Sequence, residues 1–123
     1  MSHIVSIHTE VRDRVAVERA CTRLGLTAPT EGEARIYATT KTGLLVRLEG
    51  WEFPVCCDLA SGEVHFDNFG GAWGDRKRLD EFLQGYAIEK ATIEARKKGY
   101  SVVEQRLDDG SVKLVIGVAG EGR

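Results

Sequence analysis

Alternating apolar and polar residues in the middle of the chain constrain its fold more than any other feature of the sequence. Apolar side chains occupy every second position in three short runs: 44–48, 53–59 and 64–66. Successive side chains of a β-strand point to opposite faces of a sheet, so each run predicts a strand with one apolar face. The three runs together predict an antiparallel meander whose apolar face needs a cover of helices.

The second and third of these strands predict a hairpin with a defined register. A two-residue turn at 61–62 would place Leu59 opposite Val64. The same register would place Cys57 opposite Phe66, so the apolar side chains of the hairpin would share one face.

Two segments have the spacing of amphipathic helices. Asp13 is a suitable N-cap for a helix that ends at Gly25, and Asp75 is a suitable N-cap for a longer helix that ends at Gly99. The longer helix has a group of large apolar side chains on one side: Leu79, Phe82, Leu83, Tyr86 and Ile93. We expect this side to pack on the sheet.

The apolar arc of the longer helix is wider than a single sheet can cover. Ile88 lies on the side of the helix opposite Leu79, and alanines extend the arc between them. Either the first helix or a second protein chain must cover Ile88. We therefore treat Ile88 as a candidate partner-binding residue.

The end of the chain predicts a second hairpin. With Asp109-Gly110 as a two-residue turn, Leu107 would pair with Val112, and the apolar residues of 101–118 would again share one face.

The remaining segments complete the order of elements. Residues 2–11 predict a first strand, and residues 26–33 contain a proline and a glycine without periodicity, which indicates an exposed connection. The expected order is β-α-β-β-β-α-β-β. We predict an α+β fold with a mostly antiparallel sheet and two helices packed on one face.

Length and composition place the chain among ordinary globular proteins. Its 123 residues are enough for a single α+β domain over 1–123. The 17 basic and 19 acidic residues give a net charge of -2, which provides no general attraction to nucleic acid or anionic membranes. The N-terminus does not resemble a signal peptide, no apolar run is long enough for a membrane span, and three cysteines fit a reducing compartment. The cytoplasm is the expected location.

The reverse face of the first hairpin carries four candidate metal ligands. In the expected register Cys56 lies opposite Asp67, and Asp58 lies opposite His65. The alternative is that these residues are ordinary polar positions of a sheet face. No familiar ligand spacing supports the metal site, so we expect neither a metal nor any other cofactor.

The glycine-rich segment NFGGAWG, residues 68–74, precedes the longer helix. Its position resembles an anion-binding loop, but it lacks the residues of the known phosphate-binding motifs. Phe69 and Trp73 in this loop either fold back on the core or bind a partner. No catalytic motif is present elsewhere in the chain.

Basic residues are clustered at both ends of the longer helix, at 76–78 and 96–98. Nucleic-acid binding through these ends is a third hypothesis. Acidic residues on the same helix nearly balance the cations, and the second cluster suits the negative end of the helix dipole, so we do not expect nucleic acid as a partner.

The two ends of the chain are similar to a known group of proteins. The start, MSHIVSIHTEVRDRVAVERACTRLGL, and the end, FLQGYAIEKATIEARKKGYSVVEQRLDDGSVKLVI, cover about half of the chain. They resemble the uncharacterised hypothetical chloroplast reading frame thirty-five family of cyanobacteria, algal plastids and other bacteria. The resemblance implies no activity and no site residue, but it implies an AAA-type ATPase as a possible partner.

Three functions remain open at this point. The first is a small non-enzymatic accessory or adaptor domain that docks onto a larger protein, for which the resemblance implies an AAA-type ATPase, or that forms a homo-oligomer. The second is a small-molecule or metal-binding module that uses residues 56–74. The third is nucleic-acid binding. We expect the first, because the sequence combines an over-wide apolar arc on the longer helix and large aromatic residues in a glycine-rich loop with the absence of a catalytic constellation.

Overall fold

Seven strands and two α-helices follow one another along residues 5–8, 10–36 and 39–117, which the computed structural model describes. The elements are β1 (Val5–His8), α1 (Arg14–Arg23), β2 (Thr30–Ile36), β3 (Thr39–Val46), β4 (Val55–Asp58), β5 (Glu63–Phe66), a 3-10 turn (Phe69–Gly71), α2 (Arg76–Lys97), β6 (Ser101–Arg106) and β7 (Val112–Gly117). Residues 2–4 of the predicted first strand lie outside the described residues. No helix in the described ranges has both the length and the apolar character needed to cross a membrane.

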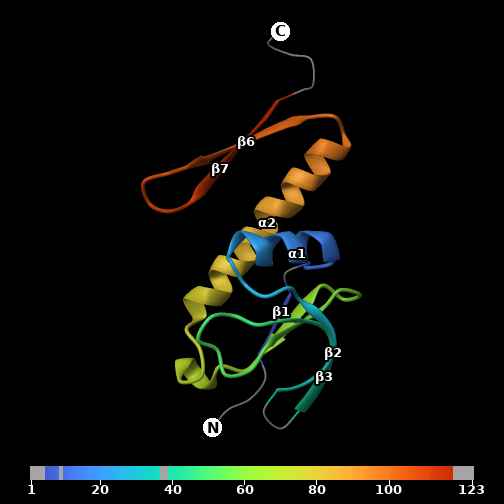
Figure 1. Cartoon of the computed structure of the whole chain (residues 1–123), viewed down its shortest axis with the longest axis vertical. Coiled ribbons are helices and arrows are strands. Elements are labelled where there is room, and N and C mark those ends of the chain that lie inside the picture. The colour runs from blue at the N-terminus through green and yellow to red at the C-terminus, as the bar shows by residue number, and fades with distance from the viewer. Residues whose placement is uncertain (1–4, 9, 37–38, 118–123) are drawn as a thin grey trace.

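Five of the strands form one antiparallel sheet in the order β1-β5-β4-β3-β2. Both helices pack on the same face of this sheet, as Figure 1 shows, and share a core with its apolar side chains. Leu44, Cys57 and Val64 are directly opposite one another across three strands and are at most 1% exposed. This arrangement confirms the predicted α+β class, with a mostly antiparallel sheet and both helices on one face.

Strand β2 lies where the sequence predicts an exposed connection over 26–33, and that prediction is wrong from Thr30 onward. The strand is the edge of the sheet and pairs with β3 along its whole length. Its charged side chains, Glu31, Glu33 and Arg35, are exposed, and only Ala34 and Ile36 are buried apolar residues. Charged residues are common on edge strands, and here they alternate with Gly32, Ala34 and Ile36, whose small first members give only a weak apolar signal.

The hairpin of β4 and β5 has a four-residue loop rather than the expected two-residue turn. Asp58 Oδ1 accepts hydrogen bonds from the amides of Ala60 and Ser61, and the Gly62 amide donates to the Asp58 carbonyl. These bonds shift the register by two residues, so that Cys57 pairs with Val64. A shift of two leaves every side chain on its expected face, because the side-chain period of a strand is also two.

Helix α1 begins and ends where the sequence predicts. The Asp13 carboxylate accepts a hydrogen bond from the Ala16 amide, and Gly25 follows the helix with a positive φ of 69°. The helix buries its predicted apolar stripe, and Cys21 on that stripe is 1% exposed.

Helix α2 has different neighbours on different sides. Leu79, Phe82 and Tyr86 belong to the core shared with the sheet. Gly85 faces α1, where a methyl group in its place would lie 3.7 Å from the Ala20 side chain. Ile88 is only 7% exposed within the chain itself. Other segments of the same chain therefore cover Ile88, which corrects the expectation that Ile88 faces a partner.

Strands β6 and β7 form a separate two-stranded sheet, and their register differs from the expected one by a single residue. Arg106, rather than Leu107, pairs with Val112. The loop is longer than expected because the Ser111 amide and hydroxyl both donate to Asp109 Oδ1. A shift of one residue reverses the faces of one strand relative to the other. The apolar side chains of this hairpin are therefore divided between both faces of the sheet.

Candidate functional site

The four candidate metal ligands do not come together as a binding site. The observed register places Cys56 directly opposite His65, whereas Asp58 lies opposite Glu63. Cys56 and His65 are both buried, and the Asp58 carboxylate is used in the β4–β5 loop. Across the described ranges, no group of three or more His, Cys, Asp and Glu side chains is placed to hold a metal ion.

The cysteines are held in their protonated form. Burial raises the pKa of Cys56, the pKa of Cys57 to about 12 and the pKa of Cys21 to about 11. A nucleophile or a metal ligand must be a thiolate, and burial in apolar surroundings disfavours the thiolate. These three side chains therefore act as small core residues.

Asp67 shapes the glycine-rich loop. Its side chain is 2% exposed, Oδ1 accepts a hydrogen bond of 3.0 Å from the Phe69 amide, and Oδ2 has no hydrogen-bond partner. The amides of Gly71 and Trp73 donate to the Asn68 carbonyl, at 3.0 and 2.9 Å. Because these amides are used within the loop, they do not form a cradle for a phosphate.

The aromatic residues of the loop pack on one another. Phe69 has a positive φ of 47° and stacks on Trp73, with 4.8 Å between the ring centroids. The rings of Trp73 and Phe53 meet in a T-shaped arrangement, with 5.3 Å between their centroids. Trp73 is half-buried, whereas Phe69 remains 41% exposed. Of the two aromatic partner candidates, Phe69 thus presents more of its ring to solvent.

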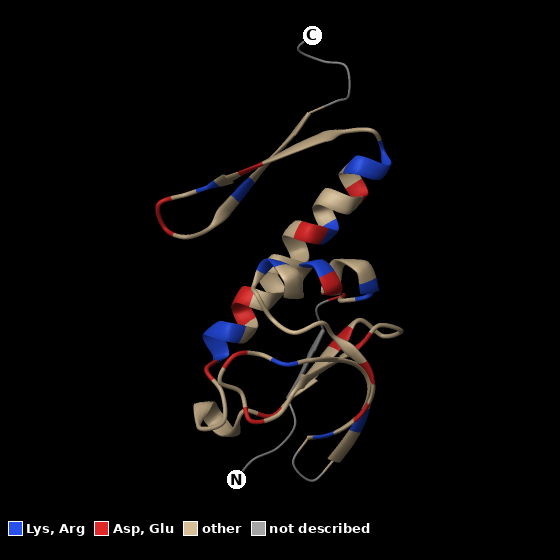
Figure 2. Cartoon of the chain, viewed as in Figure 1, with Lys and Arg blue, Asp and Glu red and all other residues tan. Residues whose placement is uncertain are grey.

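The basic ends of α2 are balanced by neighbouring carboxylates. Arg76 pairs with Asp80, Arg78 with Glu81, and Lys97 with Glu94. Figure 2 shows acidic segments beside the basic ones along this helix. The arrangement does not provide the continuous basic stripe that a nucleic-acid backbone requires.

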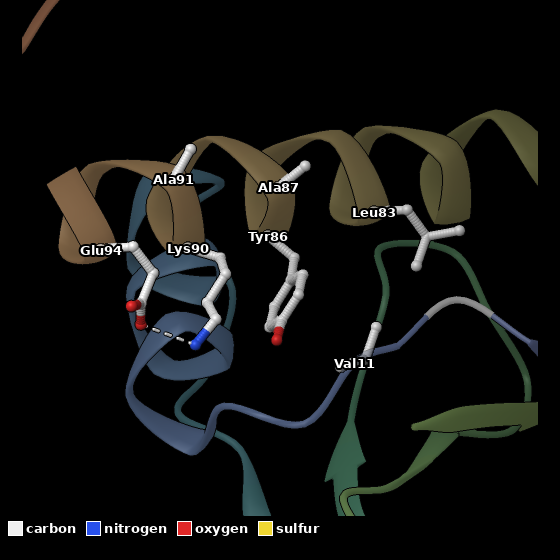
Figure 3. A pocket seen from close by; sticks show the side chains of 7 residues that line it. All are labelled: Val11, Leu83, Tyr86, Ala87, Lys90, Ala91 and Glu94. Carbon is white, nitrogen blue, oxygen red and sulfur yellow. Dashed lines mark hydrogen bonds and ion pairs between the residues drawn. The ribbon is translucent and has the colours of Figure 1, made fainter. Parts of the chain in front are cut away.

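A groove of about 340 Å³ lies between α2 and the segment that joins β1 to α1. Its lining residues are Val11, Leu83, Tyr86, Ala87, Lys90, Ala91 and Glu94, which are drawn in Figure 3. Figure 3 shows Leu83 at one end, Lys90 and Glu94 at the other, and Tyr86 between them. Leu83 is half-buried and Ala87 is exposed, so this is the part of the apolar arc of α2 that the chain leaves open. We call it the α2 groove.

The polar groups of the α2 groove are all engaged in bonds that hold the fold together. The Tyr86 hydroxyl accepts hydrogen bonds from the amides of Arg12 and Asp13, at 3.1 and 3.0 Å. Lys90 Nζ lies 2.9 Å from Glu94 Oε1 and 3.1 Å from Asp13 Oδ2. These hydrogen bonds to Glu94 and Asp13 raise the pKa of Lys90, and the bond from Lys90 lowers the pKa of Glu94. Both groups are therefore kept charged at neutral pH.

The chemistry of the α2 groove suits binding rather than catalysis. A general base or an activated nucleophile needs a pKa close to the working pH, whereas these shifts move Lys90 and Glu94 away from it. The groove instead offers an apolar floor with a cation and a carboxylate at one end. The sequence showed that the apolar arc of α2 is too wide, but it pointed to Ile88 rather than to Ala87. The position of Val11 beneath the helix depends on the tertiary structure.

Comparison with known proteins adds no relative. The chain matches no family model, no curated protein and no solved structure at a significant level. The family resemblance of the two chain ends therefore stays a prediction.

Proposed function

We propose that this protein is a small non-enzymatic adaptor domain that docks onto a larger protein through the α2 groove. The observation that carries the proposal is the groove itself, which is lined by apolar side chains and whose polar groups are already bonded within the fold. Protein interfaces are commonly centred on a few apolar anchors that enter such depressions, with charged groups at the rim.

The volume of the groove would also suit part of a small ligand, because ligand pockets begin at about 300 Å³. The number of free polar groups in the groove distinguishes a small-molecule site from a site that docks a protein. A small-molecule site orients its ligand with free donors and acceptors, whereas the Tyr86 hydroxyl here accepts two backbone amides. An apolar side chain of a partner fills the groove without requiring new polar contacts.

The identity of the partner rests on other grounds. An AAA-type ATPase is proposed only because of the family resemblance of the chain ends, and the cytoplasm is proposed only from composition. Phe69 is a second candidate contact, because its ring is 41% exposed on a loop held by internal hydrogen bonds.

A matched pair of substitutions tests the proposal. Ala87→Arg places a long charged side chain in the groove, and Ala28→Arg makes the same change at an exposed position between α1 and β2, outside the groove. Both variants should fold, as circular dichroism and urea unfolding would show. Tagged wild-type and variant proteins are purified from the native cell, and the proteins recovered with each are quantified by mass spectrometry.

We expect the recovery of one protein to decrease at least about tenfold with Ala87→Arg and to remain unchanged with Ala28→Arg. A tenfold decrease corresponds to about 1.4 kcal/mol of lost binding free energy. The purified partner should then show the same difference in a direct titration. Equal recovery of every protein by the two variants would contradict docking at the α2 groove.

A further inference from the structure

The C-terminal hairpin leaves open edges that the rest of the chain does not pair. Strands β6 and β7 form a sheet of two strands, and within the described residues neither strand has a second neighbour. Figure 1 shows this hairpin extending from the end of α2 that is farther from the five-stranded sheet. A two-stranded sheet is only marginally stable, and an open edge presents unpaired amide and carbonyl groups to other chains.

The hydrogen bonds of the hairpin identify which backbone groups of β7 face outward. The Leu107 amide donates to the Ser111 carbonyl, so these two residues form a hydrogen-bonded pair at the start of the ladder. Such pairs alternate along an antiparallel ladder, and Lys113 and Val115 therefore bond to β6. The amides and carbonyls of the intervening residues point to the open edge: Val112, Leu114 and Ile116.

The two edges of the hairpin differ in protection. Strand β6 carries Glu104 and Arg106, and Glu104 is paired with Arg23 of α1. Strand β7 carries a single charged residue, Lys113. Charged side chains discourage pairing at an edge, and β-branched apolar residues favour it. The edge of β7 is therefore the one suited to accept another strand.

We propose that a second copy of this chain pairs with β7, so that two β7 strands join antiparallel about a twofold axis at Leu114. In this register the outward groups of Val112 meet those of Ile116 of the partner subunit, and Leu114 meets its own symmetry mate. Three outward amides and three outward carbonyls on each strand are then all paired. The product is a four-stranded sheet in the order β6-β7-β7-β6.

The side chains favour a second copy over a strand of another protein. Val115 is 47% exposed and Ile116 is 48% exposed in the single chain. The symmetric register places Lys113 of the partner subunit beside Val115, where its aliphatic stem covers the valine while the ammonium group reaches water. It also places Val112 of the partner subunit beside Ile116. No charged residue of one β7 strand then lies directly opposite a like charge of the other.

This dimer does not involve the α2 groove, so it can be tested independently of the adaptor function. Ile116→Pro removes an outward amide of β7 without removing a bond to β6. Arg106→Pro is the matched control, because it removes an outward amide at the edge of β6. Sedimentation equilibrium over a range of concentrations measures the association of the wild type and of each variant, and circular dichroism checks that each is folded.

We expect a dimer for the wild type and Arg106→Pro, and at least about tenfold weaker association for Ile116→Pro. Amide hydrogen exchange provides a second measurement that needs no substitution. The amides of Val112, Leu114 and Ile116 should exchange more slowly as the protein concentration rises, whereas those of Lys113 and Val115 should not change.

Each other result would overturn the proposal. A wild type that remains monomeric, a dimer that is equally stable in both proline variants, or loss of the dimer in both would exclude pairing at β7. Concentration-independent exchange of the three outward amides would exclude it as well, even if a dimer forms through another surface.

Discussion

The Tyr86 hydroxyl joins two segments that are far apart in the sequence, and its removal tests how the fold is held together. It accepts hydrogen bonds from the amides of Arg12 and Asp13, which lie just before α1. The Tyr86 side chain is buried, at 5% exposed. Tyr86→Phe keeps the ring in the core and removes only the oxygen, so both amides lose their acceptor.

The expected cost follows from these two bonds. Each hydrogen bond contributes about 0.5–1.5 kcal/mol, and a buried donor left without an acceptor costs at least as much. The free energy of unfolding should therefore fall by about 1–3 kcal/mol. With a urea slope of about 1–3 kcal/mol per molar, a loss of 2 kcal/mol lowers the unfolding midpoint by about 1 M.

Urea unfolding followed by circular dichroism measures this change, and Tyr100→Phe serves as the control. Tyr100 is 37% exposed, and its substitution should change the free energy of unfolding by less than about 0.5 kcal/mol. If Tyr86→Phe were as neutral as Tyr100→Phe, water would be replacing the hydroxyl, and the proposed anchoring of the α1 N-terminus to α2 would be refuted.

Two further predictions concern stability. Phe82→Ala should lower the free energy of unfolding by about 3–5 kcal/mol, because Phe82 is fully buried. Leu83→Ala should lower it by less than half as much, because Leu83 lines an open groove. Equal losses of the two variants in urea unfolding would contradict this assignment of the helix faces. Burial opposes ionisation of Asp13, but hydrogen bonds from Lys90 and the Ala16 amide outweigh it and lower its pKa below the ordinary value. A lowered folded-state pKa stabilises the fold above the unfolded value of about 3.9 and loses that effect as the pH falls through the folded-state pKa. Asp13→Asn, which retains a capping side chain, should therefore lower the urea midpoint at about pH 7 but have little effect at about pH 2; a difference that persists in acid would show that the charge is not responsible.

The two helices and the strands of the meander could be predicted because their signals are local. Asp13 and Asp75 cap the helices where the sequence places them, and the apolar spacing that follows depends only on the geometry of a helix. The faces of β4 and β5 were also predictable, since alternation survives a register shift of two residues. The edge strand β2 was not predicted, because the residues that alternate with its charged side chains begin with a glycine and an alanine, which give a weak apolar signal.

The turns were the weakest part of the sequence-based predictions. Two-residue turns at 61–62 and 109–110 are reasonable from their glycines, but side chains of Asp58 and Asp109 bind the loop backbone and lengthen both loops. At the first hairpin the difference brings Cys56 opposite His65. At the second it divides the apolar side chains between two faces and leaves Val103 exposed, at 60%.

The sequence by itself determined the class of fold, the two helices and the excess of apolar surface on α2. Only the tertiary structure decided which part of that surface stays open. Ile88 is buried within the chain and Ala87 lines the groove that remains, because the segments that cover α2 are placed by long-range contacts such as the pairing of Arg23 with Glu104. Local periodicity states that a face must be buried, whereas the neighbour that buries it is set by the packing of distant segments.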